Sequence, residues 1–374
     1  MDRITQRIDY QREFIQHLHT RTVVPVMSNA FRLEAIFRDD PELHKTMKQF
    51  PEFYDDVRTI DQQLTKKWAK DIVSYPMSDE HNLARVAQYY QVVLEDTEEA
   101  KNQYLGFLGD TLLSHYQNVE GYADAVNQLR RKAPRPIFSK MVSELGLPSF
   151  SEDKEDPLLL LAQLPLPIYI TTSYFGFIEG ALKEAGKKPV TQFWSWSGGD
   201  SGVKVEYLPD PEYDPPVPPN KPRDFIPTLE QPVVYHLFGM ENEAKTLVMS
   251  EDDYMNFLMN SAQERGNLDV IPSELLTALS GKRLLLLGYH LPDWDFRALF
   301  RFISKFRSGD PKYIPPSISI QLKPSLENKE FEEMSLSYLE KYFKEYKFNV
   351  KWLDTEQFIY ELSNAWESIG KGQP

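Results

Sequence analysis

The chain has 374 residues, of which 41% are hydrophobic, so it can bury a large core in one large domain or two medium ones. Its formal net charge of −14 argues against a broad phosphate-binding surface, and direct binding to nucleic acid is not expected. The absence of cysteine excludes disulfides and thiolate zinc sites, and no metal is expected. The sequence shows no apolar leader and no run near the roughly 18 apolar residues of a membrane span. A cytoplasmic protein with no membrane partner is therefore expected.

The first half of the chain predicts a strand, a long helical segment and a second strand–helix pair. A short β-branched run predicts a buried strand at 22–27, and Ser28-Asn29-Ala30 opens a helix. Residues 40–145 carry apolar residues at helical spacing and almost no β-branched run, which predicts a helical insertion. The next strand is expected at 164–172, and the helix at 175–186 ends at a glycine.

The second half continues the alternation after a proline-rich surface loop at 209–232, where nine prolines exclude a helix and an interior strand. Short apolar runs predict strands at 232–239, 246–250, 284–287, 317–322 and 349–353. Helical patterns lie at 253–258, 335–346 and 357–369. Strands that alternate with helices predict an α/β fold, a Rossmann-like doubly wound parallel sheet. We expect a single domain over residues 1–374 that carries the helical insertion.

The leucine run at 284–287 breaks at Gly288 and then becomes polar and aromatic. Ligands of parallel sheets bind at the carboxyl ends of the strands, so the glycine marks a place where the backbone can approach a bound molecule. The side chains placed to meet it are Tyr289, His290, Asp293 and Asp295. The alternative is an ordinary turn, with the two aspartates at the start of a helix.

Six segments resemble the bacterial SIR2-like proteins, sirtuin relatives found in anti-phage defence systems. They are residues 22–27, 169–174, 234–239, 247–254, 287–297 and 319–321. The resemblance covers residues 22–360, with the helical block as an insertion after the first strand–helix unit. It implies a Rossmann-like NAD-binding fold, cleavage of NAD at the nicotinamide glycosidic bond and assembly as a homo-oligomer. It also implies, for some members, a partner ATPase or helicase of the HerA-like kind.

The lack of cysteine narrows the activities that the resemblance implies. Sirtuin deacetylases carry a four-cysteine zinc ribbon, which this chain cannot build. Hydrolysis of NAD, transfer of ADP-ribose and nucleotide binding alone remain.

The phosphate-binding motif departs from the family pattern. Ser28, Asn29 and Ala30 stand where the family shows Gly-Ala-Gly. The resemblance implies that backbone N–H groups here, at a helix N-terminus, face the pyrophosphate. Arg32 is expected to offer its guanidinium to a phosphate; the alternative is a solvated helix residue.

The catalytic motifs depart as well. Ser173 replaces the catalytic asparagine of the family, and Phe238 stands at the position of its catalytic histidine. His236 lies two residues earlier, on the same face of an ideal strand. We expect Ser173 and His236 to be catalytic, with His236 as the base that takes a proton from the ribose or from water. The alternative for His236 is a structural hydrogen-bonding residue.

Three further residues are expected at the nucleotide. Gly288 allows close backbone approach, His290 donates to a phosphate or caps a turn, and Gln321 holds a ribose hydroxyl or lies on the surface.

The sequence therefore predicts an NAD hydrolase of anti-phage defence. The alternative is a catalytically weakened nucleotide-binding scaffold or sensor subunit for a partner ATPase. The aromatic residues of the helical block are expected to contribute to a subunit interface, with internal packing as the alternative. They are Tyr89, Tyr90, Tyr104, Phe107 and Tyr116.

Overall fold

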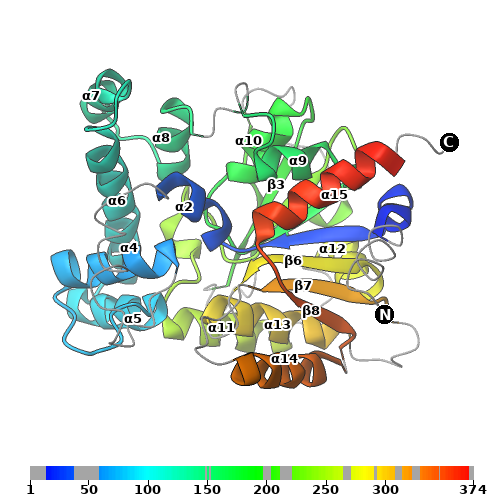
Figure 1. Ribbon diagram of the computed structural model, residues 1–374. Helices are drawn as coiled ribbons and strands as arrows, with labels where there is room; N and C mark the ends of the chain where they lie inside the picture. The colour runs from blue at the N-terminus through cyan, green and yellow to red at the C-terminus, as the bar shows by residue number, and fades with distance from the viewer. Residues whose placement is uncertain are drawn as a thin grey trace.

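A mostly parallel sheet forms the centre of the structure (Figure 1). The computed structural model describes residues 14–37, 59–147, 150, 153–196, 204–210, 221–263, 271–289, 293–307, 314–321, 329–344 and 346–369. Within this part of the chain the sheet has eight strands, in the order β4-β3-β5-β2-β1-β6-β7-β8. The strands are β1 (Val23–Met27), β2 (Ile168–Thr171), β3 (Val190–Ser195), β4 (Lys204–Tyr207), β5 (Val233–His236), β6 (Arg283–Tyr289), β7 (Ser317–Gln321) and β8 (Phe348–Trp352).

The central strands are the continuous apolar runs of the sequence. Every residue of β1 is buried, and so is every residue of β6 after Arg283. Such runs suit parallel strands that are covered on both faces. β1 pairs in parallel with β2 on one side and with β6 on the other, whereas β4 pairs antiparallel with β3. The predicted Rossmann-like α/β class is confirmed.

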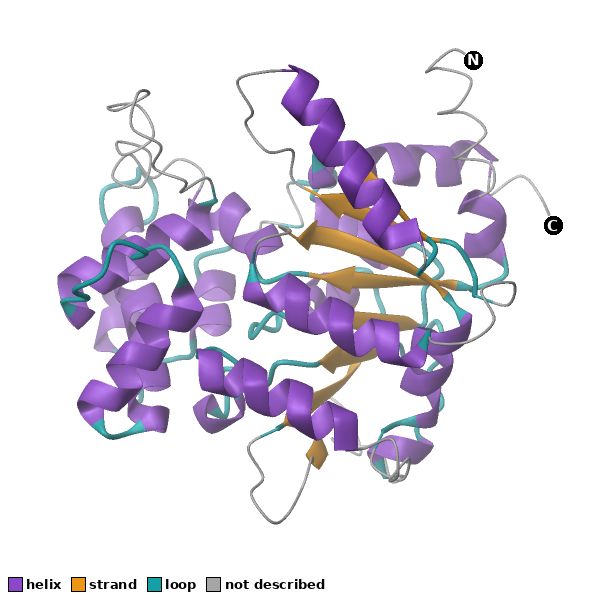
Figure 2. Ribbon diagram, turned by 90° about the horizontal axis from the view of Figure 1, so that it is seen from below, coloured by secondary structure: helices purple, strands orange, loops and turns teal. Residues whose placement is uncertain are grey.

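Helices surround this sheet: some pack against its two faces, and others form a block beside it. They are α2 (Ala30–Phe37), α4 (Ile60–Trp68), α5 (Leu83–Leu94), α6 (Thr97–Tyr116), α7 (Ala123–Arg131), α8 (Phe138–Glu144), α9 (Pro157–Gln163), α10 (Phe177–Glu184), α11 (Glu251–Gln263), α12 (Ser273–Gly281), α13 (Trp294–Phe306), α14 (Lys329–Lys344) and α15 (Thr355–Ile369). In Figures 1 and 2, α9, α10 and α15 lie on one side of the strands and α11, α13 and α14 on the other.

The strand order reverses at β1. From β1 the chain adds β2, then β3, β4 and β5, on one side, and it then adds β6, β7 and β8 on the other. Right-handed crossovers that run in opposite directions place their helices on opposite faces. The reversal opens a crevice at the carboxyl ends of the central strands, where open α/β sheets bind ligands.

The helical block α4–α8 lies beside the sheet, on the side to which the carboxyl ends of the parallel strands point (Figures 1 and 2). Of the predicted insertion at 40–145, residues 59–145 contain these helices and the turns between them, while 40–58 lies outside the described residues.

The aromatic residues of the block pack inside it. Trp68 contacts Tyr90 and Tyr104 with ring centroids 5.6 and 4.9 Å apart. Tyr104 is fully buried, and Tyr90, Phe107 and Tyr116 are each 8% exposed. Tyr90, Tyr104, Phe107 and Tyr116 thus stabilise the block within one chain, whereas Tyr89 is partly buried. Assembly as a homo-oligomer stays a prediction.

One predicted strand does not form, and two strands were not predicted. Ala244–Thr246 is a 3-10 turn, closed by a 2.7 Å bond from the Thr246 hydroxyl to the carbonyl of Glu243, and no strand follows at 246–250. The two strands are β3, which contains Phe193 and Trp194, and β4, in a region where the sequence analysis predicted no strand. The described part of the proline-rich loop, 221–232, contains only a 3-10 turn at Pro222–Asp224. In the described chain no helix has the length and apolarity to cross a membrane.

Candidate functional site

The carboxyl ends of β1 and β6 are joined by Ser28, which is 4% exposed. Its hydroxyl donates to the carbonyl of Gly288 at 2.5 Å, and its N–H donates to the carbonyl of Leu287 at 3.1 Å. Gly288 has φ +75° at an irregularity in the β6–β7 pairing, a conformation that glycine adopts without strain. The Ser28 hydroxyl is thus used to hold two strand ends together, and it is not directed at a phosphate.

The turn after β2 is tied to the turn after β1. The Thr171 hydroxyl donates to the carbonyl of Met27 at 3.0 Å, and the hydroxyl of Tyr289 donates to the same carbonyl at 2.9 Å. The Ser173 hydroxyl donates to the Asn29 side-chain oxygen at 3.2 Å. Ser173 and Asn29, which lie 144 residues apart in the chain, therefore present their side chains as one hydrogen-bonded pair.

His236, the last residue of β5, is fully buried, with both ring nitrogens bonded. Nδ1 lies 2.8 Å from the carbonyl oxygen of Ser173, and Nε2 lies 2.8 Å from Oε1 of Glu179 on α10. Both partners are acceptors, so both nitrogens donate and the ring is an imidazolium. Burial lowers the pKa of His236, but the charge and hydrogen bond of Glu179 outweigh it and the pKa is raised.

Glu179 is the counter-ion of this pair. Burial raises its pKa, but His236 outweighs that effect and the pKa is lowered. The hydroxyl of Thr191 on β3 also donates to its Oε1, at 2.9 Å. The sequence analysis missed Glu179. A carboxylate between the apolar residues of a helix indicates a buried charge that needs a partner, and His236 is that partner.

The role of base expected for His236 does not fit this geometry. A base needs a nitrogen that can accept a proton, and His236 donates with both. The structure supports the alternative, a structural residue that fixes the backbone at Ser173.

Arg32 does not point its charge at a nucleotide either. Its guanidinium lies 2.6 Å from the carboxylate of Asp156, which precedes α9, and the two side chains are 8% and 5% exposed. Asp156 also caps α9 by accepting from the backbone N–H groups of Leu158 and Leu159. The guanidinium is thus held in a buried ion pair.

Three other expected residues lie wholly or partly outside the described part of the chain. His290 lies outside the described residues. Ala30 begins α2 and Gln321 ends β7, and only their backbone is described.

A cavity of about 160 Å³ lies between the sheet edge and the helical block. Its sheet side is formed by Asn29, Thr172, Tyr174, Phe238, Tyr254, Asp293, Trp294 and Asp295. Its block side is formed by Asp61, Gln62, Thr65, His81, Asn82, Leu83 and Ala84. Of the residues that the sequence analysis placed at a ligand, Asn29, Asp293 and Asp295 line it.

The cavity is strongly acidic. Burial, and then the charges of Asp293 and Asp61, raise the pKa of Asp295 well above its ordinary value. Gln62 donates to Asp293 at 3.4 Å and so links α4 to the start of α13. Among the described residues no group of three or more His, Cys, Asp or Glu side chains is arranged to hold a metal ion.

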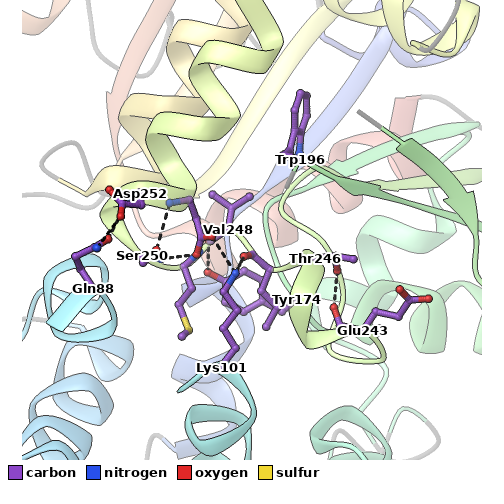
Figure 3. Close-up of polar contacts among 12 residues, drawn as sticks. Gln88, Lys101, Tyr174, Trp196, Glu243, Thr246, Val248, Ser250 and Asp252 are labelled. Carbon is purple, nitrogen blue, oxygen red and sulfur yellow. Dashed lines mark hydrogen bonds and ion pairs between the residues drawn. The ribbon is translucent and has the colours of Figure 1, made fainter. Parts of the chain in front are cut away.

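A buried ion pair joins the block to the segment at the start of α11 (Figure 3). Lys101 of α6 is 2% exposed, and its Nζ lies 2.9 Å from Asp253 and 2.6 Å from the carbonyl oxygen of Leu247. Asp253 also forms a capping box with Ser250: the Ser250 N–H donates to its carboxylate at 2.9 Å, and its own N–H donates to the Ser250 hydroxyl at 3.2 Å. The start of α11 is thereby bonded to the block.

A second contact lies beside the first (Figure 3). The side-chain amide of Gln88 on α5 donates to the Asp252 carboxylate at 2.8 Å and accepts from the Asp252 N–H at 2.9 Å. Sequence reasoning missed the block side of the cavity because no local pattern shows where an insertion folds back.

The fold and the site together define a Rossmann-like α/β protein with a polar cavity at the ligand-binding edge of its sheet. Residues 167–347, from the start of β2 to just before β8, match the SIR2-like domain family. This part of the chain is thus similar to SIR2-like domains. The match confirms the sequence resemblance over this range but does not include β1 or the block. The comparison with curated proteins found no match.

Proposed function

We propose that this protein is an NAD⁺ hydrolase that acts in anti-phage defence. The observation that carries the proposal is the polar cavity at the carboxyl ends of the strands, inside a fold that is similar to SIR2-like domains over residues 167–347. The defence role rests on the resemblance of the sequence motifs to defence proteins. A plating assay, in which bacteria that express the protein are challenged with phage, tests that role by the reduction in plaques.

The reaction requires few catalytic groups from the protein. The bond between nicotinamide and ribose breaks, nicotinamide leaves as a neutral molecule with the bonding electrons, and the ribose becomes oxocarbenium-like. Water adds to the ribose C1′ and loses a proton, which gives ADP-ribose, nicotinamide and H⁺. The protein must position the ribose and accept that proton.

Asn29 is the residue that we assign to the ribose. It lines the cavity, and because its side-chain oxygen accepts from Ser173, its amide N–H₂ is left to donate to a ligand. Asn29 thus supplies, from the turn after β1, the carboxamide that the resemblance implies at position 173. His236 acts through Ser173 as a positioning residue.

Asp295 is the residue that we assign as the proton acceptor. It lines the cavity, and the raised pKa of its carboxyl brings it toward the working pH, where a base is most effective.

The test is incubation of the purified full chain with NAD⁺ while nicotinamide and ADP-ribose are quantified. Asn29→Ala and Asp295→Asn are each expected to reduce kcat by about 10²-fold or more. Asp124→Asn, at an exposed position of α7, is the control that changes the net charge without touching the cavity. Hydrolysis that persists at the wild-type rate in both cavity variants would show that this is not the reaction centre.

A second function is favoured by two specific observations. His236 has no nitrogen free to accept a proton, and Phe238 lines the cavity where the resemblance places a catalytic histidine. A catalytically weakened scaffold or sensor subunit for a partner ATPase or helicase would have these features. Binding of NAD⁺ without cleavage, alone and with such a partner, is the result that would favour it. In either role we propose a homo-oligomer, to be checked by light scattering.

A further inference from the structure

Aromatic rings form one wall of the cavity described above. Phe238, Tyr254 and Trp294 all line it. Tyr254 and Trp294 are stacked, with centroids 5.8 Å apart and planes 21° apart, and Phe238 meets Tyr254 edge-on at 5.6 Å. Ring faces carry partial negative charge, so an aromatic wall attracts a cation or a flat cationic ring.

Carboxylates from two separate elements lie beside these rings. Asp61 comes from the first turn of α4, while Asp293 and Asp295 come from the start of α13. No lysine or arginine is among the described residues that line the cavity. A ligand with a positive charge therefore meets attraction from both the rings and the carboxylates.

The electrostatics of the empty cavity point the same way. Burial, and then the neighbouring charges of Asp293 and Asp61, raise the pKa of Asp295, which shows that negative charge is costly to concentrate here. A bound cation offsets that cost, whereas a phosphate would increase it.

Size restricts what can enter. The volume of about 160 Å³ is below the roughly 300–1,000 Å³ of pockets that enclose drug-sized ligands, so the cavity takes a single ring and its attachment, not a whole dinucleotide.

We propose that the cavity is a receptor for a cationic aromatic ring, and that it selects NAD⁺, whose nicotinamide is a pyridinium cation, over NADH, whose dihydronicotinamide is neutral. The selection of NAD⁺ rests on the proposed function, whereas the preference for a cationic ring does not. The same wall also assists product release, because cleavage turns the held cation into neutral nicotinamide and removes the attraction.

Two small probes isolate the effect of charge. 1-Methylnicotinamide is a pyridinium cation and nicotinamide is its neutral counterpart, and both are small enough to enter without a phosphate. Titration calorimetry on the full chain is expected to show about 10-fold or tighter binding of the cation. Asp61→Asn and Asp293→Asn are each expected to weaken cation binding by about 10-fold and to change nicotinamide binding by less than about 2-fold. Asp124→Asn again serves as the control of equal charge change.

Equal binding of the two probes, or a preference that survives both substitutions, would overturn the proposal. If the proposed function is wrong, NAD⁺ would be neither cleaved nor bound, whereas the preference for the cationic probe would remain. A comparison of NAD⁺ with NADH completes the test, and equal affinity for the two would remove the claimed selection between redox forms.

Discussion

The ion pair between Lys101 and Asp253 is expected to hold the helical block to the sheet domain, and its removal should be costly. In Lys101→Met the packing volume is kept, but Asp253 loses a charged partner at 2.9 Å and the carbonyl of Leu247 loses its 2.6 Å donor. Breaking a buried pair costs about 3–5 kcal/mol. Asp253 still accepts from two backbone N–H groups, at Met249 and Ser250, so we expect the lower end, about 3 kcal/mol.

Urea unfolding of the full chain, followed by fluorescence, measures this loss. The pair of Lys67 and Asp71 on the same block provides a control, because its side chains are 35% and 50% exposed. Lys67→Met is expected to cost only about 0–1 kcal/mol. A double-mutant cycle with Asp253→Asn isolates the pairwise energy. A loss below about 1 kcal/mol for Lys101→Met would refute the argument from burial.

Three further outcomes are expected from unfolding measurements. The free energy of unfolding should fall as pH rises from about 5 to 8. Burial raises the pKa of Glu241 to about 7, and Glu179 raises the pKa of His236. The folded state therefore binds more protons than the unfolded state in this range. Glu179→Gln and Glu241→Gln should each flatten the slope of a pH series, and an unchanged slope would contradict these assignments. Gly239→Ala should cost at least about 3 kcal/mol, since φ is +79° and an added Cβ would lie 2.3 Å from a backbone oxygen; a near-neutral urea midpoint would oppose this. Ser28→Ala should cost about 1–3 kcal/mol because it leaves the buried bulge carbonyl without its side-chain donor, and a wild-type stability would show that the bond contributes little.

The sequence allowed the sheet to be predicted because its signals are local. A run of β-branched or leucine residues bounded by polar residues predicted β1, β2, β5 and β6, and the rule for strand ends brought Ser28 and Ser173 to one edge. The strand predicted at 246–250 does not form. The Thr246 hydroxyl donates to the carbonyl of Glu243 in the preceding turn, and Lys101 donates to the carbonyl of Leu247, which in a strand would accept from a neighbouring strand.

The roles of individual charged residues were not predictable in this way. The partner of His236 lies 57 residues away, and the partner of Arg32 lies 124 residues away. A sequence shows the type of a side chain but not which acceptor the fold brings to it. The position of Asp61 could not be predicted either, because α4 belongs to the helical block, and nothing in the sequence shows that the block lies against the ends of the strands.

The buried ion pair also has a consequence for ligand exchange. The cavity lies between the block and the sheet, so moving the whole block aside would require Lys101 to leave Asp253. The block is then a fixed wall of the cavity. Ligand exchange that requires displacement of the block is expected to be slow. The rate of ligand exchange is therefore expected to be set by motions that leave the ion pair of Lys101 intact.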